Sequence, residues 1–448
     1  MNDFKSKIIN VVFGTSILQL STIANFIILA RLLSVDDFGL LRQLLLISQM
    51  VFSVIFATVP VSVLYFCGLH KDGKSKSDIV ITHTKVCVFL GLASGVLIFT
   101  FKDLIALIFG REELAHYLIE FSLYPLFIVV YYFVPTVLIA LGKEKYIKWY
   151  CPFVAVSNTA IIALAALIYG LDYVVYAYVL SSGISFLLAL WVICSVTKNH
   201  YDTRFSKGVV SYNQIIKYSW FLTLASCIGI LASRYDHVLV SNELGVTVFA
   251  VYAVGAFQLP IYSIIQSSVN SVIFGKMVEL HAKGDWLNFS KLWVRAINKI
   301  SIICLPLSAL FMVFSEEFIS VLFGKAYVSG SWIFICFSLL APIRCVSFGH
   351  IFKVIGKPHL DVIGAVFLLI MTLLFVTVGT KTYGALGAAI GVVLSVYSMS
   401  IFLVFVIKQQ TKGNMKLLNI FPASLFVTFF SSLFVFSALK YSFFWLFY

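Results

Sequence analysis

The stretch Asp103-Leu-Ile-Ala-Leu-Ile-Phe-Gly-Arg111 returns 214 positions later as Glu317-Phe-Ile-Ser-Val-Leu-Phe-Gly-Lys325. In both copies an acidic residue opens a short apolar segment that closes with Phe-Gly and a basic residue. Each copy ends a long apolar run, and six such runs fit between one copy and the next. The repeat therefore predicts a chain built from two similar halves.

Two shorter repeats occur in the same order along the chain. Gly142-Lys143 returns as Gly356-Lys357, again 214 positions later. Leu33-x-Val35-x-x-Phe38 returns as Leu244-x-Val246-x-x-Phe249 after 211 positions, so a small gap separates the two registers. Three repeats that occur in the same order in both halves favour two tandem six-helix halves over chance similarity. This organisation is typical of transporters.

The composition places the chain in a membrane. Apolar residues make up 61% of its 448 residues and charged residues 11%, whereas soluble domains are about half apolar. A membrane-spanning helix needs about 20 apolar residues. Runs of this kind lie near 8–30, 40–66, 79–101, 116–141, 149–170, 173–196, 218–240, 248–273, 300–315, 331–355, 361–380, 384–407 and 419–439. We therefore predict an all-α integral membrane protein with 12–13 transmembrane helices as two parallel six-helix repeats.

The repeats also predict where the halves begin and end. Residues 1–200 are predicted to form the N-terminal six-helix bundle, 201–410 the C-terminal bundle and 411–448 an additional hydrophobic segment. The first apolar run follows Lys5 and Lys7, but it is too long for a signal-peptide core and no small-x-small cleavage site follows it. We expect it to remain as a helix.

The net charge of +13 follows membrane topology. With the N-terminus in the cytoplasm, the predicted inner segments, in which Lys85 is counted, hold 23 of the 32 Lys and Arg residues. Arg234 and Arg344 fall inside helices, and seven lie on outer segments: Arg31, Arg42, Lys102, Arg111, Lys325, Lys381 and Lys440. This positive-inside alternation accounts for the basicity without a nucleic-acid partner. Because six is even, both halves enter the membrane in the same orientation.

One match to a phosphate-binding loop, Gly68-Leu-His-Lys-Asp-Gly73-Lys74-Ser75, has the wrong context. Such a loop binds phosphate only where a strand precedes it and a helix follows it in a nucleotide-binding domain. Here the stretch joins two predicted membrane helices. We interpret it as a basic hairpin loop.

The rest of the sequence predicts neither an enzyme nor a cofactor. It has no G-x-S-x-G or H-E-x-x-H motif, and its eight cysteines are scattered without metal-ligand spacing. A membrane polysaccharide polymerase is the nearest enzymatic alternative, but it would carry a large outer loop that this chain lacks. The longest loops, near 197–217 and 275–299, are amphipathic, and the second has Trp286, Phe289, Leu292 and Trp293 at helical spacing. We predict that they lie on the inner membrane surface.

Polar residues inside the apolar runs mark the predicted substrate site. A charge at mid-membrane costs about 2.5–3.5 kcal/mol, so it should line a cavity or be paired. Arg344 is placed near the middle of its run, and Arg234 shares a helix face with His237. The other candidates are Arg31, Arg42, Asn25, Gln49, Gln258, Gln266 and Asn270, the last three on one helix face. For each amide the alternative is an interhelical hydrogen bond, and for Arg31 and Arg42 it is snorkelling to the outer boundary.

Asp236 and Glu120 are acidic residues placed within the predicted spans, Glu120 in the first turn of its helix. Burial favours the protonated form of a carboxylic acid, which lets the group exchange protons. We therefore predict both as ion-coupling residues. The alternative is an ion pair with a basic neighbour, such as Asp236 with Arg344.

Several stretches resemble a known family. Ala30-Arg31-Leu-Leu-Ser-Val-Asp-Asp-Phe38-Gly39 is similar to the A-R-x-L-G-x-x-x-F-G junction of polysaccharide flippases, with Ser34 in place of a glycine. The segment from Arg234 to Tyr252 resembles the seventh-helix region of that family, although Ala250 departs from a usual glycine, and Leu322-Phe-Gly324 resembles its ninth-helix end. The whole chain resembles the O-antigen flippases of the multidrug/oligosaccharidyl-lipid/polysaccharide exporter superfamily.

This resemblance implies two six-helix bundles around a central cavity in the bacterial inner membrane. It implies alternating access that carries a polyprenyl-diphosphate-linked oligosaccharide to the outer leaflet, with that substrate, the lipid bilayer and polysaccharide assembly proteins as partners. Arginines suit the diphosphate, and amides and aromatic rings suit the sugar. A drug/cation antiporter of the same superfamily is the alternative, and it would need acidic cavity residues. An unrelated sugar permease would have a G-x-x-x-D-R-x-G-R-like motif, which is absent from Gly68–Lys85.

Overall fold

The computed structural model describes residues 2–70, 72–168, 170–198, 210–258, 261–357 and 359–447. All regular secondary structure in these ranges is helical. The chain divides into two compact units. Unit 1 is Met1–Ile230 with Gly245–Ala250, and unit 2 is Leu231–Leu244 with Val251–Tyr448.

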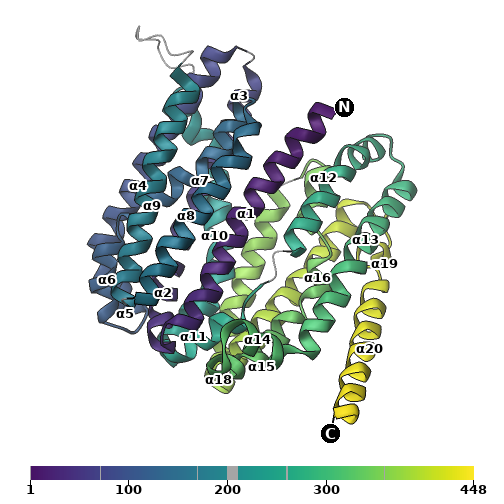
Figure 1. Ribbon diagram of the computed structural model, residues 1–448. Coiled ribbons are helices and arrows are strands. Elements are labelled where there is room, and N and C mark those ends of the chain that lie inside the picture. Colours follow the sequence, from purple (N-terminus) through teal and green to yellow (C-terminus); the bar gives the residue numbers. More distant parts are fainter. Residues whose placement is uncertain are drawn as a thin grey trace. The chain divides into compact units, whose positions relative to one another are not determined.

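Unit 1 is a bundle of long helices in which α4, α7, α8 and α9 pack side by side (Figure 1). The apolar runs predicted in this half are helical, but the second is interrupted at Ala57-Thr58 and the fourth bends by 45°. In chain order the elements are α1 (Asn2–Leu32), α2 (Val35–Phe56), α3 (Val59–Leu69), α4 (Gly73–Thr100), α5 (Lys102–Ile108), α6 (Glu113–Phe121), α7 (Tyr124–Ala140), η1 (Glu144–Tyr146), α8 (Ile147–Ile168), α9 (Leu171–Thr197) and the first part of α10 (Tyr212–Leu244). The stretch that matched a phosphate-binding loop joins helices α3 and α4.

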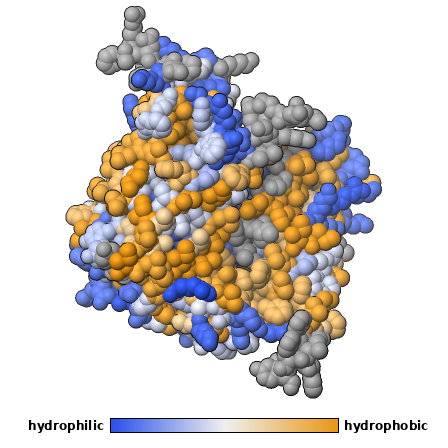
Figure 2. Space-filling view, in the orientation of Figure 1, coloured by the Kyte–Doolittle hydropathy of each residue, from blue (hydrophilic) through white to orange (hydrophobic). Residues whose placement is uncertain are grey.

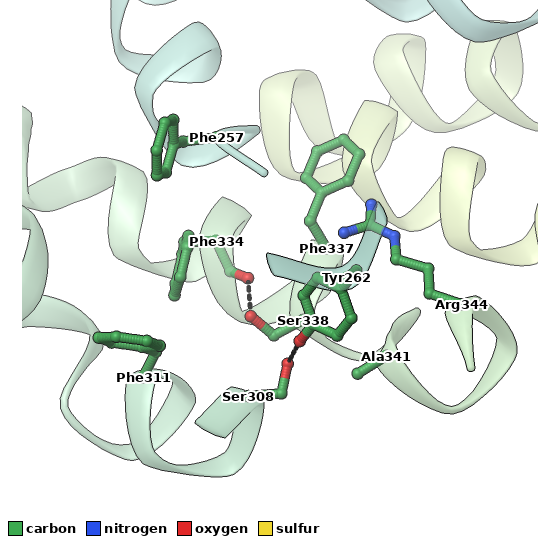
Figure 3. Close-up of a pocket in the computed structure, with 9 residues that line it drawn as sticks. All are labelled: Phe257, Tyr262, Ser308, Phe311, Phe334, Phe337, Ser338, Ala341 and Arg344. Atoms are coloured by element: carbon green, nitrogen blue, oxygen red, sulfur yellow. Dashed lines mark hydrogen bonds between the residues drawn. The ribbon is translucent and has the colours of Figure 1, made fainter. Parts of the chain in front are cut away.

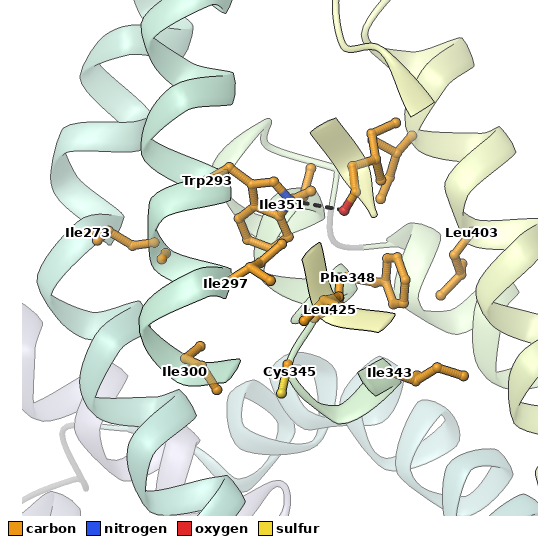
Figure 4. Close-up of a cluster of buried hydrophobic side chains, with 14 of the residues drawn as sticks. Ile273, Trp293, Ile297, Ile300, Ile343, Cys345, Phe348, Ile351, Leu403 and Leu425 are labelled. Atoms are coloured by element: carbon orange, nitrogen blue, oxygen red, sulfur yellow. Dashed lines mark hydrogen bonds between the residues drawn. The ribbon is translucent and has the colours of Figure 1, made fainter. Parts of the chain in front are cut away.

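Unit 2 contains the end of α10 and the later helices, several of which are short. After α10 they are the second half of α11 (Val246–Gly255), whose residues up to Ala250 belong to unit 1, and then α12 (Ile261–Ala282), α13 (Trp286–Val313), α14 (Ser315–Phe323), η3 (Lys325–Gly330), α15 (Ser331–Ser338), α16 (Ala341–Arg344), α17 (Phe348–Val354), α18 (His359–Gln410), α19 (Leu417–Ile420) and α20 (Ser424–Phe447). The core of this unit is a cluster of buried side chains from α12, α13 and α16 to α20 (Figure 4).

The helices fit a membrane in length and in surface. Eight in the described residues are long and apolar enough to cross it, or up to eleven if each of three bent pairs is one span. Hydrophobic side chains dominate the surface seen in Figure 2, and exposed ones include Trp149, Trp191 and Phe434, at 72%, 67% and 77%. Exposure of such large apolar side chains suits lipid contact and not water. The predicted all-α integral membrane fold is confirmed.

Helix α18 is two helices joined at a tight turn. At 52 residues a straight helix would be about 78 Å long, far beyond the roughly 30 Å of the hydrocarbon core. The backbone leaves helical geometry at Tyr383 and Gly384. The two arms then pack closely, because a Cβ atom on Gly387 would overlap the carbonyl of Gly379. Small residues that permit such approach are the usual means of packing membrane helices.

The repeated Gly-Lys pairs, 142–143 and 356–357, adopt the same structure in both units. Each glycine follows a helix and has a positive φ, 69° in one and 72° in the other, a region that glycine enters without strain. Each lysine amide donates to the carbonyl five residues earlier. The lysine Nζ reaches the Val196 carbonyl in one unit and the Gln410 side chain in the other, in both cases 53 residues farther on. These echoes in the sequence therefore correspond to equivalent structural positions.

The amphipathic segment before the ninth run does not lie on a membrane surface as predicted. α13 is one 28-residue helix, so residues 286–299 continue directly into the run predicted at 300–315. Phe289 and Trp293 are buried in the core of unit 2, and Trp293 Nε1 donates to the Ile420 carbonyl at 3.2 Å (Figure 4). This apolar face of α13 packs against other helices of unit 2 and not against lipid. Most of the loop near 197–217 lies outside the described residues.

The C-terminal helix α20 runs parallel to α13 and packs along it. Near its start, Ser424 Oγ donates to the Asn298 side chain at 2.9 Å. Near its end, Lys440 Nζ donates to the carbonyl of Val313, the last residue of α13, and pairs with Glu317 at 2.8 Å. Residues Ser424–Tyr441 are also apolar enough to cross a membrane. The last hydrophobic segment is therefore a further candidate span of unit 2.

The topology predicts which helix ends share a side of the membrane. We expect single cysteines at Asp72 and Lys283 to be cytoplasmic and those at Glu112 and Ala326 to be external, because the sequence repeat predicts the same orientation for both halves. The measurement is labelling with a membrane-impermeant maleimide in whole cells and in inverted vesicles, in a chain whose native cysteines are replaced. The unsubstituted cysteine-free chain is the control. Labelling of positions 72 and 283 from opposite sides would contradict this topology.

Candidate substrate-binding site

The predicted run at 331–355 is not one helix. It consists of α15, α16 and α17, with a bend of 52° between the segments before and after residues 339–340. Arg344 is the last residue of α16, and residues 345–347 lie outside any helix. The placement of Arg344 in the middle of a continuous helix is therefore wrong. It lies at a break, where backbone groups lack their usual helical partners.

Two amides of α12 stabilise this break. Gln266 Nε2 donates to the Arg344 carbonyl at 2.9 Å, and Asn270 Nδ2 donates to Ser347 Oγ at 2.7 Å. Both are interhelical hydrogen bonds, the alternative that the sequence left open for these amides. They fix the backbone on both sides of the break and thereby position the Arg344 side chain.

Gln258 does not belong to the same polar stripe. The run predicted at 248–273 is divided into α11 and α12, and Gln258 is an exposed residue between the two helices. The common helix face of Gln258, Gln266 and Asn270 required an unbroken helix. That prediction is therefore wrong for Gln258.

The Arg344 guanidinium faces a small pocket of unit 2 (Figure 3). Its central carbon lies 5.8 Å from the centre of the Tyr262 ring, an arrangement that favours a cation. The side chain is partly exposed and has no ion pair within the described residues. The other lining residues are Phe257, Ser308, Phe311, Phe334, Phe337, Ser338 and Ala341. The pocket therefore offers one cation, aromatic rings and hydroxyl groups, but no carboxylate.

Asp236 has partners of its own. It is 3% exposed, accepts a hydrogen bond from Tyr252 Oη at 2.6 Å and contacts His237 Nδ1 at 3.1 Å. Its nearest ring nitrogen is therefore that of the adjacent histidine, and no ion pair with Arg344 exists in the described part of the chain. Arg234, in the same helix, is partly buried and does not line the Arg344 pocket.

In unit 1 the predicted candidates lie in α1 and α2. The Arg42 guanidinium lies 4.6 Å from the centre of the Phe26 ring. Asn25 is 8% exposed, and its Oδ1 is buried without a hydrogen-bond donor among the described residues. Gln49 is partly exposed on α2, and Arg31 is exposed near the end of α1.

The sequence analysis missed two features of unit 1. Gln43 is fully buried, and its Nε2 donates at 3.4 Å to the carbonyl of Phe109, which lies within the first repeated stretch. Phe52, Phe56 and Tyr132 form a cluster, with the two phenylalanine rings stacked at 4.8 Å. Periodicity could not single out these rings, because the chain has 43 phenylalanines and 22 tyrosines.

Glu120 is near the end of the short helix α6 and not in the first turn of a long one. Its Oε1 accepts a hydrogen bond from Tyr176 at 2.6 Å and lies 3.6 Å from His116 Nε2. Its Oε2 is buried without a hydrogen-bond partner among the described residues. The ion-coupling roles of Glu120 and Asp236, like the substrate contacts above, stay predictions.

Comparison with known proteins identifies the family. The model of a family described as "Polysaccharide biosynthesis protein" matches residues 28–331, which is most of the chain. The protein belongs to this family. A Shigella flexneri protein named as an O-antigen transporter is 22% identical over 87% of this chain and 94% of its own length. The Staphylococcus aureus capsular polysaccharide biosynthesis protein CapF is 26% identical over 44% of this chain, and the match spans 50% of that relative.

Solved transporter structures share the fold. An inward-facing MATE multidrug transporter has a TM-score of 0.71, and the match covers 90% of this chain and 98% of that one at 14% identity. The lipid II flippase MurJ, in an inward closed conformation, has a TM-score of 0.69 over 96% and 98% at the same identity. This family member is therefore a multi-pass protein of the bacterial cytoplasmic membrane with the fold of a transporter. The resemblance to polysaccharide and O-antigen flippases is confirmed.

The geometry around Asp236 generates a stability prediction. Tyr252→Phe removes a donor from a buried carboxylate, which should cost about 1.5–3 kcal/mol, whereas a neutral hydrogen bond contributes about 1 kcal/mol. We therefore expect a larger fall in melting temperature for Tyr252→Phe than for Tyr235→Phe. Tyr235 is the matched control because its hydroxyl contacts the neutral Thr377 at 2.8 Å. Equal falls, measured on purified protein in detergent, would contradict the charged hydrogen bond.

Proposed function

We propose that this family member is a flippase for a polyprenyl-diphosphate-linked oligosaccharide, the repeat unit of an O-antigen or another surface polysaccharide. It moves this substrate across the cytoplasmic membrane by alternating access. The supporting observation is Arg344, a partly exposed guanidinium in an apolar segment with no acidic partner in the described residues. Flipping breaks no covalent bond, so the function needs no catalytic residue or cofactor.

The pocket chemistry suits an oligosaccharide diphosphate. A guanidinium presents two parallel N–H donors to two phosphate oxygens, which a carboxylate-lined pocket could not do. Tyr262 and Ser308 line the same pocket and their hydroxyl groups contact each other, whereas Ser338 donates to the Phe334 carbonyl at 2.8 Å (Figure 3). The Tyr262–Ser308 pair therefore keeps one hydroxyl proton that can be donated to a phosphate or sugar oxygen. Gln266 fixes the backbone of Arg344 and so acts as a positioning residue.

Residues of unit 1 are proposed to bind the sugar. Asn25 carries a buried acceptor without a donor, which a sugar hydroxyl would satisfy. The rings of Phe52, Phe56 and Tyr132 provide an apolar surface for a sugar face. Arg31, Arg42, Gln49 and Arg234 are proposed as further substrate contacts. The polysaccharide assembly proteins that supply and consume the repeat unit are the proposed partners.

Two alternative functions fit less well. A drug/cation antiporter would attract its cationic substrate with a carboxylate, but the Arg344 pocket has none, and both oxygens of Asp236 already contact Tyr252 and His237. A polysaccharide polymerase would need a large outer loop. The outer connection between α5 and α6 is only residues 109–112.

Substitution of Arg344 tests the anion site. Arg344→Lys keeps the charge but loses the bidentate fork, and Arg344→Ala loses both. We expect both variants to be as abundant in the membrane as the parent, with translocation at least tenfold lower, because a charge-assisted hydrogen bond contributes about 1.5–3 kcal/mol. The measurement is the appearance of lipid-linked repeat units in the outer leaflet, with binding of a polyprenyl diphosphate to purified protein as a second readout.

Arg295→Lys and Arg295→Ala are the matched controls, because Arg295 is exposed on α13 in the same unit. They should translocate normally. Normal translocation by both Arg344 variants would overturn the anion site. So would a defect in Arg344→Ala that is explained entirely by loss of the protein from the membrane, with Arg344→Lys fully active.

The ion-coupling proposal is tested separately. Asp236→Asn and Glu120→Gln keep the size of each side chain but remove the titratable proton. If these residues couple proton flow to transport, we expect each variant to lose the stimulation that a pH gradient gives in proteoliposomes. Glu317→Gln, in an exposed ion pair with Lys440, is the control. A variant that keeps both transport and its response to the gradient removes that residue from the coupling model.

A further inference from the structure

Unit 1 contains an apolar groove that the proposed transport does not use. It has a volume of about 600 Å³, within the range of small-molecule sites. Helices α2, α3, α4 and the first part of α10 enclose it, with hydrocarbon and aromatic side chains on nearly all sides. The lining residues are Val54, Ile55, Thr58, Val59, Lys85, Val86, Phe89, Leu90, Tyr212, Ile215, Ile216, Ser219, Trp220 and Thr223.

Lys85 is the one charged residue among them. The charge pattern had assigned it to an inner loop, but it lies 12 residues into α4, about 18 Å along the helix from its start. Its side chain is exposed and has no ion pair or hydrogen bond within the described part of the chain. An ammonium group in an apolar segment without a partner is costly. The groove therefore lacks an anion that belongs to the protein.

Ser219 supplies a second observation. Its Oγ is buried in the wall of the groove and has no hydrogen-bond partner among the described residues. A buried hydroxyl without a partner costs about 1–3 kcal/mol. The groove thus combines an unpaired cation, an unpaired hydroxyl and an apolar wall. Together these features match a molecule with an anionic head and a hydrocarbon tail.

We propose that this groove binds one anionic phospholipid of the inner leaflet, with an acyl chain along the apolar wall and its phosphodiester against Lys85 and Ser219. Side chains on a helix lean toward its N-terminus. For α4 that end is the turn at Asp72, which the topology places in the cytoplasm. Lys85 therefore extends toward the inner headgroups.

The number of charges favours a bilayer lipid over the transported substrate. A phosphodiester carries one negative charge, which one ammonium group neutralises. A diphosphate carries more charge and is better matched by the planar fork of an arginine. The site is thus proposed to be separate from the Arg344 pocket, and it does not depend on the transport function.

Native mass spectrometry of the purified full chain tests this assignment, with phosphatidylglycerol and phosphatidylcholine as the added lipids. We expect one phosphatidylglycerol to bind preferentially and to raise the melting temperature. Lys85→Ala should weaken its binding about tenfold, because one charge-assisted contact is lost, and Lys85→Arg should retain it. Val86→Trp should reduce binding by filling the groove without a change of charge.

Lys217→Ala is the matched control, since Lys217 is exposed on α10 in the same unit but does not line the groove. It should bind phosphatidylglycerol as the parent does. Equal binding of the two lipids, or equal losses in Lys85→Ala and Lys217→Ala, would overturn the site. Displacement of phosphatidylglycerol by a polyprenyl diphosphate through Lys85 would instead assign the groove to the substrate and overturn the choice of a bilayer lipid. If Lys85→Ala is poorly folded, the other two variants still test the site. Lys85→Arg tests whether a positive charge at position 85 is sufficient for lipid binding, and Val86→Trp tests whether the lipid occupies the groove.

Discussion

A backbone carbonyl that loses its helical partner inside a bilayer must find another donor, because hydrocarbon supplies none. Several apolar runs of this protein break within their length, and side chains from neighbouring helices donate to the groups that are freed. Two bonds of this kind, Gln266 to Arg344 and Tyr397 to Leu339, lie at the breaks in the run at 331–355. The bonds of Trp293 to Ile420, Lys143 to Val196 and Lys440 to Val313 satisfy carbonyls at helix ends in the same way. Many of the polar side chains in the apolar runs therefore stabilise the backbone first.

This requirement separates the candidates for substrate binding. The side-chain amide of Gln266 is already bonded, so its contribution is to hold the break. The guanidinium of Arg344 has no hydrogen bond or ion pair among the described residues, although the carbonyl of the same residue is bonded. The break thus releases a carbonyl that α12 must satisfy and directs a cation into a pocket. A movement of α12 relative to residues 344–347 would change both the stability of the break and the position of the cation.

The sequence predicted the membrane class, the repeats and the family, because these depend on composition and on spacing over hundreds of residues. It did not predict the breaks, because a broken apolar run has the same composition as a continuous one. Proline is no guide: Pro342 lies at the start of α16 beside a break, but Pro152 and Pro306 lie inside continuous helices. The depth of Arg344 was calculated for a straight helix and was wrong for this reason. Lys85 was counted with the inner segments although it lies within the run near 79–101, because the charge pattern indicates the side of the membrane to which a lysine is nearest and not its depth in a helix.

The 214-residue offset shows where the two halves differ. The bend at residues 339–340 has a counterpart close to its equivalent position, at residues 122–123 of unit 1. The offset relates Arg344, however, to Val130, a fully buried residue inside the continuous helix α7, so within the described residues the interruption at 345–347 and its cation have no equivalent in unit 1. It relates Lys85 of α4 to Lys299 of α13, and Tyr212 of α10 to Phe426 of α20. In unit 2 the contact of α13 with α20 is filled by Leu425 and Phe429, which are 0% and 2% exposed. In unit 1 the corresponding contact leaves a groove. Between α13 and α20 of unit 2, close packing thus forms part of the core. Between α4 and α10 of unit 1, looser packing leaves room for the proposed lipid chain beside Lys85.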